Sequence, residues 1–170
     1  MMYGITGTPG TGKSVVADEL ARRGYHVVHL AETIADFVIG RDEERDSRIV
    51  DTDRWVSGFQ IIDGIVEGHL AHLLPCDRIV VLRCSPEELR RRLTLRKYGQ
   101  QKIDENVEAE ALDVCLIETT ERYDASHILE LDTTQLDAGS CATRIDGFFE
   151  GIVPPSFGGI DWSGYLEVVR

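Results

Sequence analysis

Short apolar runs alternate along the chain with segments whose apolar residues recur at helical spacing. Runs of this length that are rich in Val, Ile and Leu are typical of strands covered on both faces. This alternation predicts an α/β fold with a five-stranded, mostly parallel sheet and helices on both of its faces. The predicted strands lie within residues 2–6, 25–29, 61–67, 78–84 and 127–131, and the predicted helices within 15–23, 31–39, 52–59, 86–97, 104–124 and 138–149.

Several element boundaries follow from local chemistry. In Ser85-Pro86-Glu87-Glu88, Ser85 is predicted to cap a helix that starts at Pro86, with Glu88 reaching back to the cap. Gly40 is expected to end the helix before it. Residues 41–48 are too polar to pack, so we expect an exposed, mobile segment there.

The stretch Gly7-Thr8-Pro9-Gly10-Thr11-Gly12-Lys13-Ser14 fits the P-loop pattern and lies between a predicted strand and a predicted helix, as that motif requires. Backbone N–H groups in such a loop face a phosphate, and the helix N-terminus adds partial positive charge. Lys13 would bridge the terminal phosphates, and the Ser14 hydroxyl would ligate Mg2+. The residues expected to bind the nucleotide here are Gly10, Thr11, Gly12, Lys13, Ser14 and Val15.

Two acids near the third predicted strand compete for the metal-facing position. Glu67 is favoured over Asp63 because ligands of parallel sheets bind beyond the carboxyl ends of the strands. His69 and His72 have a spacing that allows a metal pair, but no third ligand is near them. We therefore expect one functional histidine, His69, and one packing or surface histidine.

Composition limits the possible functions. The 170 residues suffice for a single domain, expected at 1–150, followed by an irregular tail at 151–170. The chain has neither a membrane span nor a signal peptide, and its four cysteines lack disulfide or zinc spacing, so a cytoplasmic protein is expected.

The formal net charge of -12 argues against strong direct binding of nucleic acid. A basic stretch, residues 83–102, is the exception and favours a small polyanion held at one place. The alternative is an ordinary solvated helix face, which is the better interpretation for Arg90 and Arg91 individually.

The chain resembles the small adenylate kinases of the nuclear, CINAP-like type and their archaeal relatives, which double as ribosome-assembly ATPases. The resemblance covers most of the chain. Besides the P-loop, it is carried by Val66-Glu67-Gly68-His69 with Leu73-Leu74-Pro75, by residues 79–83, and by residues 92–98 leading into 105–110.

This resemblance implies a P-loop kinase core with a nucleotide-monophosphate-binding segment at 29–53 and a short lid at 95–105. It implies that Arg96 contacts ATP phosphates. Arg92 is a further candidate for binding the nucleotide. The family usually has Asp where this chain has Glu67. Ordinary adenylate kinases bind AMP with an arginine that follows a Gly-Phe-Pro sequence, and this sequence is missing here. Arg41, Arg45 and Arg48 are therefore the candidates for binding AMP.

The expected activity is transfer of the γ-phosphate of MgATP to AMP, together with ATPase activity, and Lys13, Glu67, His69 and Arg96 are the expected catalytic residues. The resemblance further implies a role in small ribosomal subunit biogenesis and rRNA maturation. A basic small-subunit ribosomal protein would then bind an acidic surface, with Glu108, Glu110, Glu118 and Glu121. Two alternatives remain: an ATP-driven assembly switch with incidental kinase activity, or a P-loop kinase for another small acceptor.

Overall fold

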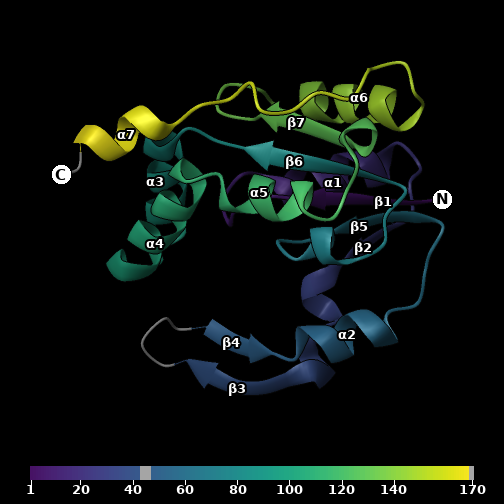
Figure 1. Ribbon diagram of the computed structural model, residues 1–170, viewed down its shortest axis with the longest axis horizontal. Helices are drawn as coiled ribbons and strands as arrows, with labels where there is room; N and C mark the ends of the chain where they lie inside the picture. The colour runs from purple at the N-terminus through teal and green to yellow at the C-terminus, as the bar shows by residue number, and fades with distance from the viewer. Residues whose placement is uncertain (43–46, 169–170) are drawn as a thin grey trace.

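A five-stranded sheet forms the centre of the protein, whose computed structural model describes residues 1–42 and 47–168 (Figure 1). Every strand pairing in this sheet is parallel, and β1 lies in the middle. The predicted five-stranded sheet is therefore confirmed. In spatial order the strands are β2 Val27–His29, β5 Gly64–Glu67, β1 Met2–Thr6, β6 Arg78–Arg83 and β7 Ile128–Asp132.

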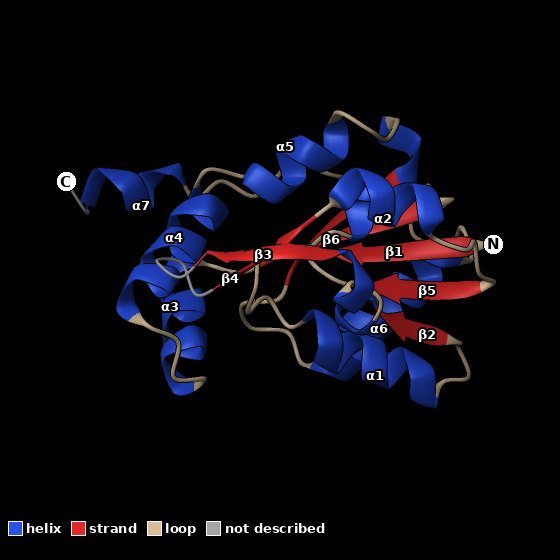
Figure 2. Ribbon diagram, turned by 90° about the horizontal axis from the view of Figure 1, so that it is seen from below, coloured by secondary structure: helices blue, strands red, loops and turns tan. Residues whose placement is uncertain are grey.

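Helices cover both faces of the sheet, as predicted (Figure 2). Helices α1 and α6 pack on one face, where Leu20, Leu82 and Phe148 lie in a single apolar cluster. The other face packs against α2, α5 and a short turn, in clusters that include Trp55 and Leu116. The helices are α1 Lys13–Arg22, α2 Thr52–Gly58, α3 Pro86–Leu95, α4 Gln100–Ala111, α5 Val114–Thr120, α6 Ala138–Phe149 and α7 Ser163–Val168.

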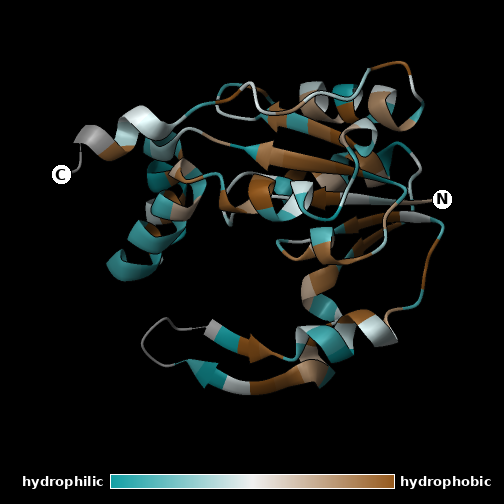
Figure 3. Ribbon diagram, viewed as in Figure 1, coloured by the Kyte–Doolittle hydropathy of each residue, from teal (hydrophilic) through white to brown (hydrophobic). Residues whose placement is uncertain are grey.

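Hydrophobic residues concentrate in the strands of the sheet, whereas α3 and α4 project from it and are largely hydrophilic (Figure 3). These two helices pack on each other through a small cluster of their own, with Leu89, Leu93 and Val107. Among the described residues, no helix combines the length and apolar character needed to cross a membrane.

The segment after β2 differs from the prediction. Two 3-10 turns, Leu30–Glu32 and Ala35–Phe37, replace the helix expected over 31–39. The chain then forms an antiparallel hairpin of β3 Val38–Asp42 and β4 Ser47–Val50, and Gly40 lies within the ladder opposite Ile49. The helix and its Gly40 cap were therefore wrong predictions, since β-branched residues such as Val38 and Ile39 favour extended backbone where a partner strand is available.

The polar segment predicted at 41–48 is also corrected in part. Residues 41–42 and 47–48 belong to β3 and β4, while the rest of that segment, with the AMP candidate Arg45, lies outside the described residues. The cross-strand register pairs Arg41 with Arg48. Two of the three candidate arginines are thus neighbours on one hairpin.

The long helix expected over 104–124 is instead two helices, α4 and α5. The break occurs at Asp113, whose backbone is left-handed with a φ of 57°. The carboxylate of Asp113 accepts a hydrogen bond from the buried guanidinium of Arg83. A tertiary contact thus interrupts a helix that local spacing predicts as continuous, and Asp is among the residues that tolerate this conformation.

The start of α3 agrees with prediction except for one contact. Ser85 caps the helix by accepting the N–H of Glu88 (3.4 Å), and Pro86 is its first residue. The Glu88 carboxylate does not reach back to the cap, because Arg91 and Arg92 donate to it. The Ser85 N–H donates to Thr134 Oγ1 instead, at 2.8 Å.

The tail beyond residue 150 is more ordered than predicted. Ser156 pairs with Leu129 beside β7, and the N–H groups of Gly158 and Gly159 donate to the Glu130 carboxylate. Farther on, the Tyr165 ring packs against the cluster between α3 and α4. The prediction of a wholly irregular tail was therefore wrong, because these contacts and helix α7 depend on docking against the domain.

Candidate functional site

The P-loop joins the carboxyl end of β1 to the first residue of α1, which begins at Lys13. Gly10 has a φ of +97°, and a Cβ on it would lie 2.7 Å from Leu89 Cδ1 and 2.9 Å from Leu93 Cδ2. Only glycine therefore fits at this position. The loop therefore packs closely against α3. The N-terminus of α1 faces the loop, and its partial positive charge favours binding of an anion.

Lys13 is buried inside this loop. Its Nζ donates to the carbonyl oxygens of Gly7 (2.8 Å) and Thr8 (3.1 Å). Burial lowers the pKa of Lys13, and the nearby Glu67 carboxylate opposes that effect. A phosphate in the loop would compete with these two carbonyls for the ammonium group.

Three polar side chains converge beside the P-loop. Glu67 is buried at the end of β5; its Oε1 lies 3.3 Å from Ser14 Oγ, and its Oε2 lies 2.7 Å from His29 Nδ1. The parallel register places His29 directly beside Glu67. The hydrogen bond that the His29 ring donates to the Glu67 carboxylate raises the pKa of His29.

The competing acid, Asp63, lies elsewhere. Its side chain is 94% exposed and pairs with the N-terminal amino group at 2.6 Å. Sequence reasoning did not identify His29 as a site residue, although its place at the end of the second strand puts it at the same edge of the sheet as Glu67.

The residues around Ser14 and Glu67 fit a Mg2+ ion. A hydroxyl and a carboxylate are hard oxygen donors, and Mg2+ in kinase sites is held by one or two such groups together with substrate phosphates and waters. Within residues 1–42 and 47–168, no three His, Cys, Asp or Glu side chains gather as a full metal cage.

The two histidines have different surroundings. His72 is buried, with its Nδ1 3.0 Å from Thr6 Oγ1 and its Nε2 3.1 Å from Glu118. His69 is exposed and lines a pocket of about 310 Å³ with Ser14, Glu67 and His29. Nearby protein atoms and the charge of Lys13 lower the pKa of His69, although contact of its ring with solvent weakens that effect.

A second pocket, of about 200 Å³, lies on the other side of the P-loop. Arg92 and Arg96 both line it. Arg92 is already held by Glu88 (2.8 Å) and the Thr133 carbonyl (2.8 Å), whereas the Arg96 guanidinium is exposed and has no hydrogen bond or ion pair within the described part of the chain. Thr133, which sequence reasoning missed, donates to the Thr11 carbonyl at 2.7 Å and fixes the loop from this side.

Glu110, expected on an acidic surface, is only 1% exposed. Its carboxylate accepts from Thr8 Oγ1 (2.5 Å) and from Arg83 Nε (2.8 Å). The prediction was therefore wrong for this residue, because the end of α4 that carries Glu110 lies against Arg83 and the P-loop.

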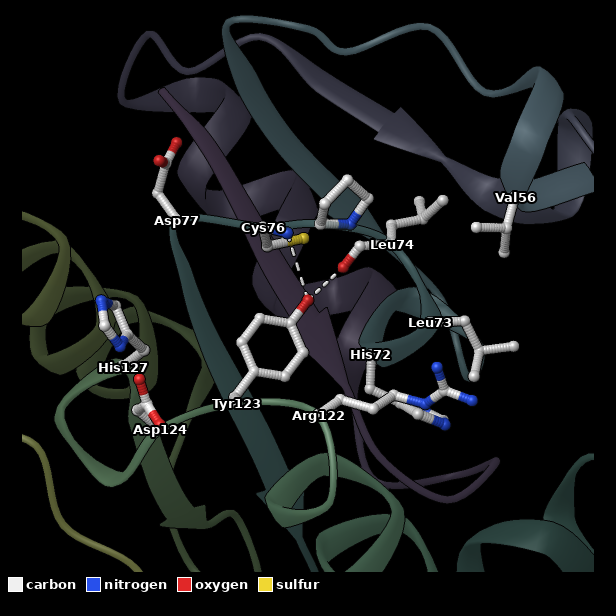
Figure 4. Close-up of a pocket in the computed structure, with 11 residues that line it drawn as sticks. Val56, His72, Leu73, Leu74, Cys76, Asp77, Arg122, Tyr123, Asp124 and His127 are labelled. Atoms are coloured by element: carbon white, nitrogen blue, oxygen red, sulfur yellow. Dashed lines mark hydrogen bonds between the residues drawn. The ribbon is translucent and has the colours of Figure 1, made fainter.

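A hollow of about 750 Å³ lies in a different region (Figure 4). Most of its lining comes from residues 72–77 and 122–127, which precede β6 and β7. Tyr123 Oη donates to the Leu74 carbonyl and accepts from the Cys76 N–H. This ring therefore holds two loops together near the amino ends of the strands, away from the P-loop.

Comparisons with known proteins show which family this chain resembles. A family model described as an AAA domain matches residues 4–113. A protein of Archaeoglobus fulgidus named "Putative adenylate kinase" is 40% identical over 98% of this chain and 94% of its own length. A protein of the same name from Methanothermobacter thermautotrophicus is 43% identical over 97% of this chain and 99% of its own.

Among solved structures, shikimate kinase from Acinetobacter baumannii matches with a TM-score of 0.63 and 15% identity, covering 88% of this chain and 93% of that one. This likeness shows the fold of a P-loop kinase. The alignments with the two archaeal proteins cover nearly the whole chain, and the family model spans the P-loop. The chain therefore belongs to the family of these archaeal relatives and is a nucleotide kinase of the P-loop class.

Proposed function

We propose that the protein is an adenylate kinase that transfers the γ-phosphate of MgATP to AMP. The observation that carries this proposal is the position of the P-loop between two pockets, one beside Arg96 and one beside Glu67. A phosphoryl group held in the loop could face a donor on one side and an acceptor on the other. The name shared by the archaeal relatives supports AMP as the acceptor.

The donor nucleotide would lie on the side of Arg92 and Arg96. Gly10, Thr11, Gly12 and Val15 line this pocket together with Leu136, so backbone N–H groups and a small apolar wall are both available. The backbone groups suit phosphates. The apolar wall suits a base or ribose.

The acceptor would enter on the side of His29 and Glu67. Close to this side lies an apolar slot of about 270 Å³ with three aromatic residues, Phe37, Trp55 and Phe59, in its lining. Aromatic slots of this kind accept a flat base. Arg41 and Arg48 of the hairpin are our candidates for the acceptor phosphate, in place of the missing Gly-Phe-Pro-Arg grip.

In this mechanism the protein contributes position and charge. Lys13 and Arg96, with Arg92, stabilise negative charge on the transferring phosphoryl group. Ser14 and Glu67 hold Mg2+, which supplies neutralising charge on the phosphate oxygens when it is bound. The segment 95–105, which runs from the last residue of α3 into the first half of α4, acts as a lid that closes to exclude water.

Incubating the protein with MgATP and a panel of acceptors tests this proposal. With AMP, ADP should form at two molecules per ATP consumed and much faster than with other nucleoside monophosphates, shikimate or sugars. Equal or faster turnover with another acceptor would contradict the AMP assignment while leaving a P-loop kinase. The arm with MgATP alone measures hydrolysis.

We also propose ATPase activity, because His69 lies in the acceptor pocket next to Glu67 and is exposed. In the absence of AMP, a water molecule can occupy that pocket, and His69 would orient it towards the phosphoryl group. The rival function, an ATP-driven assembly switch, requires hydrolysis without AMP that a protein partner stimulates. Undetectable ADP in the arm without acceptor would contradict the proposed ATPase activity. Undetectable ADP after a basic ribosomal protein is added to that arm would contradict the switch.

Arg96→Lys should lower kcat for transfer roughly tenfold or more, because losing one charge-assisted hydrogen bond costs about 1.5–3 kcal/mol and Lys lacks the planar fork that binds two phosphate oxygens. Arg91→Lys is the matched control, since Arg91 is exposed on the same helix and pairs with Glu88 at 2.7 Å. Steady-state kinetics of both variants checks this prediction. Equal behaviour of the two would remove Arg96 from the proposed donor site.

We further propose a role in small ribosomal subunit biogenesis, through a basic ribosomal protein bound to exposed acids on α4, on α5 and just after α5. Glu108, Glu118 and Glu121 are exposed there, and the formal net charge is -12. Such a complex should weaken as salt rises, since charges are screened over about 10 Å at 0.1 M ionic strength. A pull-down of small-subunit ribosomal proteins with ATP, ADP or no nucleotide tests it, and no retention at low salt would reject the partner.

A further inference from the structure

One P-loop side chain is anchored from outside the loop. Thr8 is 5% exposed, and its hydroxyl donates to Glu110 Oε2 at 2.5 Å. Glu110 belongs to α4, the helix that continues from the segment 95–105. A residue far away in sequence thus holds the second residue of the phosphate-binding loop.

The Glu110 carboxylate is itself held rigidly. Its Oε1 accepts from Arg83 Nε (2.8 Å) and from the Cys84 N–H (3.1 Å), both at the carboxyl end of β6. The Arg83 Nη2 also donates to the main-chain oxygen of Glu110, at 3.1 Å. Both carboxylate oxygens therefore have partners, and an opposite charge compensates for the burial of this one.

Thr8 in turn organises the rest of the loop. Its carbonyl oxygen accepts from the Thr11 N–H (3.2 Å), from Thr11 Oγ1 (2.9 Å) and from Lys13 Nζ (3.1 Å). A rotation of the Thr8 peptide would therefore shift the loop backbone and the ammonium group together. A binding site of this kind needs its groups held within about 0.5 Å of the productive geometry.

We propose that Glu110 is a positioning residue for the donor nucleotide: through Thr8 it holds the P-loop and Lys13 in the geometry that binds MgATP. This inference rests on the proposed function, because it assigns the anchor to the nucleotide side of that site. The anchor also links the loop to α4, whose first half belongs to the lid segment. Over the ranges that the structure describes, 1–42 and 47–168, no residue of the AMP side contacts Glu110, so AMP affinity is expected to depend on other residues.

Thr8→Val tests the inference, because Val has the shape of Thr but cannot donate to Glu110. Replacing Glu110 directly would leave the buried Arg83 without a partner and endanger folding. Calorimetry with a non-hydrolysable ATP analogue and Mg2+ should show Kd raised roughly tenfold, which corresponds to losing part of a hydrogen bond to a charged group. KM for AMP should stay unchanged, and Thr8→Ser should restore the wild-type Kd.

Thr119→Val is the matched control. Thr119 is also fully buried, and its hydroxyl donates to the Cys115 carbonyl at 2.7 Å on α5. A purely structural role for the Thr8 contact would lower Tm in both valine variants and leave Kd for the analogue unchanged in both, which would overturn the inference. If the wild-type protein bound no MgATP analogue, the proposed function and this inference would fall together; normal binding by wild type and by Thr8→Val removes the inference alone.

Discussion

Lys13→Ala should abolish transfer to AMP, with kcat at least roughly 100- to 1000-fold below that of the wild type, the usual loss when one preorganised electrostatic contact is removed. In the loop, only the Lys13 side chain supplies a full positive charge to the phosphates, while the other groups are backbone dipoles and hydroxyls. Hydrolysis should fall with transfer, since both reactions need the same phosphate to be held. A coupled assay for ADP, with and without AMP, measures both rates.

The fold should survive this substitution. Burial lowers the pKa of Lys13, which means that removing its ammonium group from water costs the folded state free energy. The substitution by Ala removes this cost. Tm should therefore stay close to that of the wild type. Arg22→Ala, which deletes an exposed charge on the same helix, is the control and should retain full activity. Near wild-type turnover by Lys13→Ala would rule out the proposed role of the P-loop.

The second large effect is expected for Glu67→Gln, which keeps the shape of the side chain and removes its charge. Oε1 of Glu67 lies next to Ser14 Oγ, so the amide would weaken the hold on Mg2+ and on its coordinated waters. We expect kcat/KM to fall about 100-fold at low Mg2+, since changes around a metal site commonly cost 10- to 100-fold. Raising the Mg2+ concentration should restore part of the activity.

A magnesium titration of the rate, not a single assay, checks this expectation. The half-saturating Mg2+ concentration should rise for Glu67→Gln and stay unchanged for Asp63→Asn, the exposed acid that pairs with the N-terminus. If no Mg2+ concentration restored the rate of Glu67→Gln, Glu67 would instead have a structural role, holding His29 and the ends of the strands in place. An Mg2+ dependence that shifts only with Asp63→Asn would reverse the choice between the two acids.

Local sequence by itself determined the P-loop, the five parallel strands and the capped start of α3. The reason is physical: a Gly-rich turn, a buried apolar run and a Ser-Pro cap each restrict the backbone within a few residues. The choice of Glu67 over Asp63 also needed no coordinates, because the carboxyl ends of parallel strands define where ligands bind. Membership of the kinase family followed from the same stretches.

Tertiary structure decided the features that depend on distant partners. The hairpin of β3 and β4 forms because the two segments can pair as strands. Taken alone, the sequence of β3 resembles the end of a helix, and the sequence of β4 resembles part of a polar loop. Arg83 breaks the acidic helix at Asp113. Glu110 looks in the sequence like one more surface acid, yet 102 positions separate it from Thr8, whose hydroxyl it accepts. Helical spacing shows which face a residue occupies, and only the tertiary contacts at the C-terminal end of α4, with Arg83 and Thr8, determine that Glu110 meets the phosphate loop.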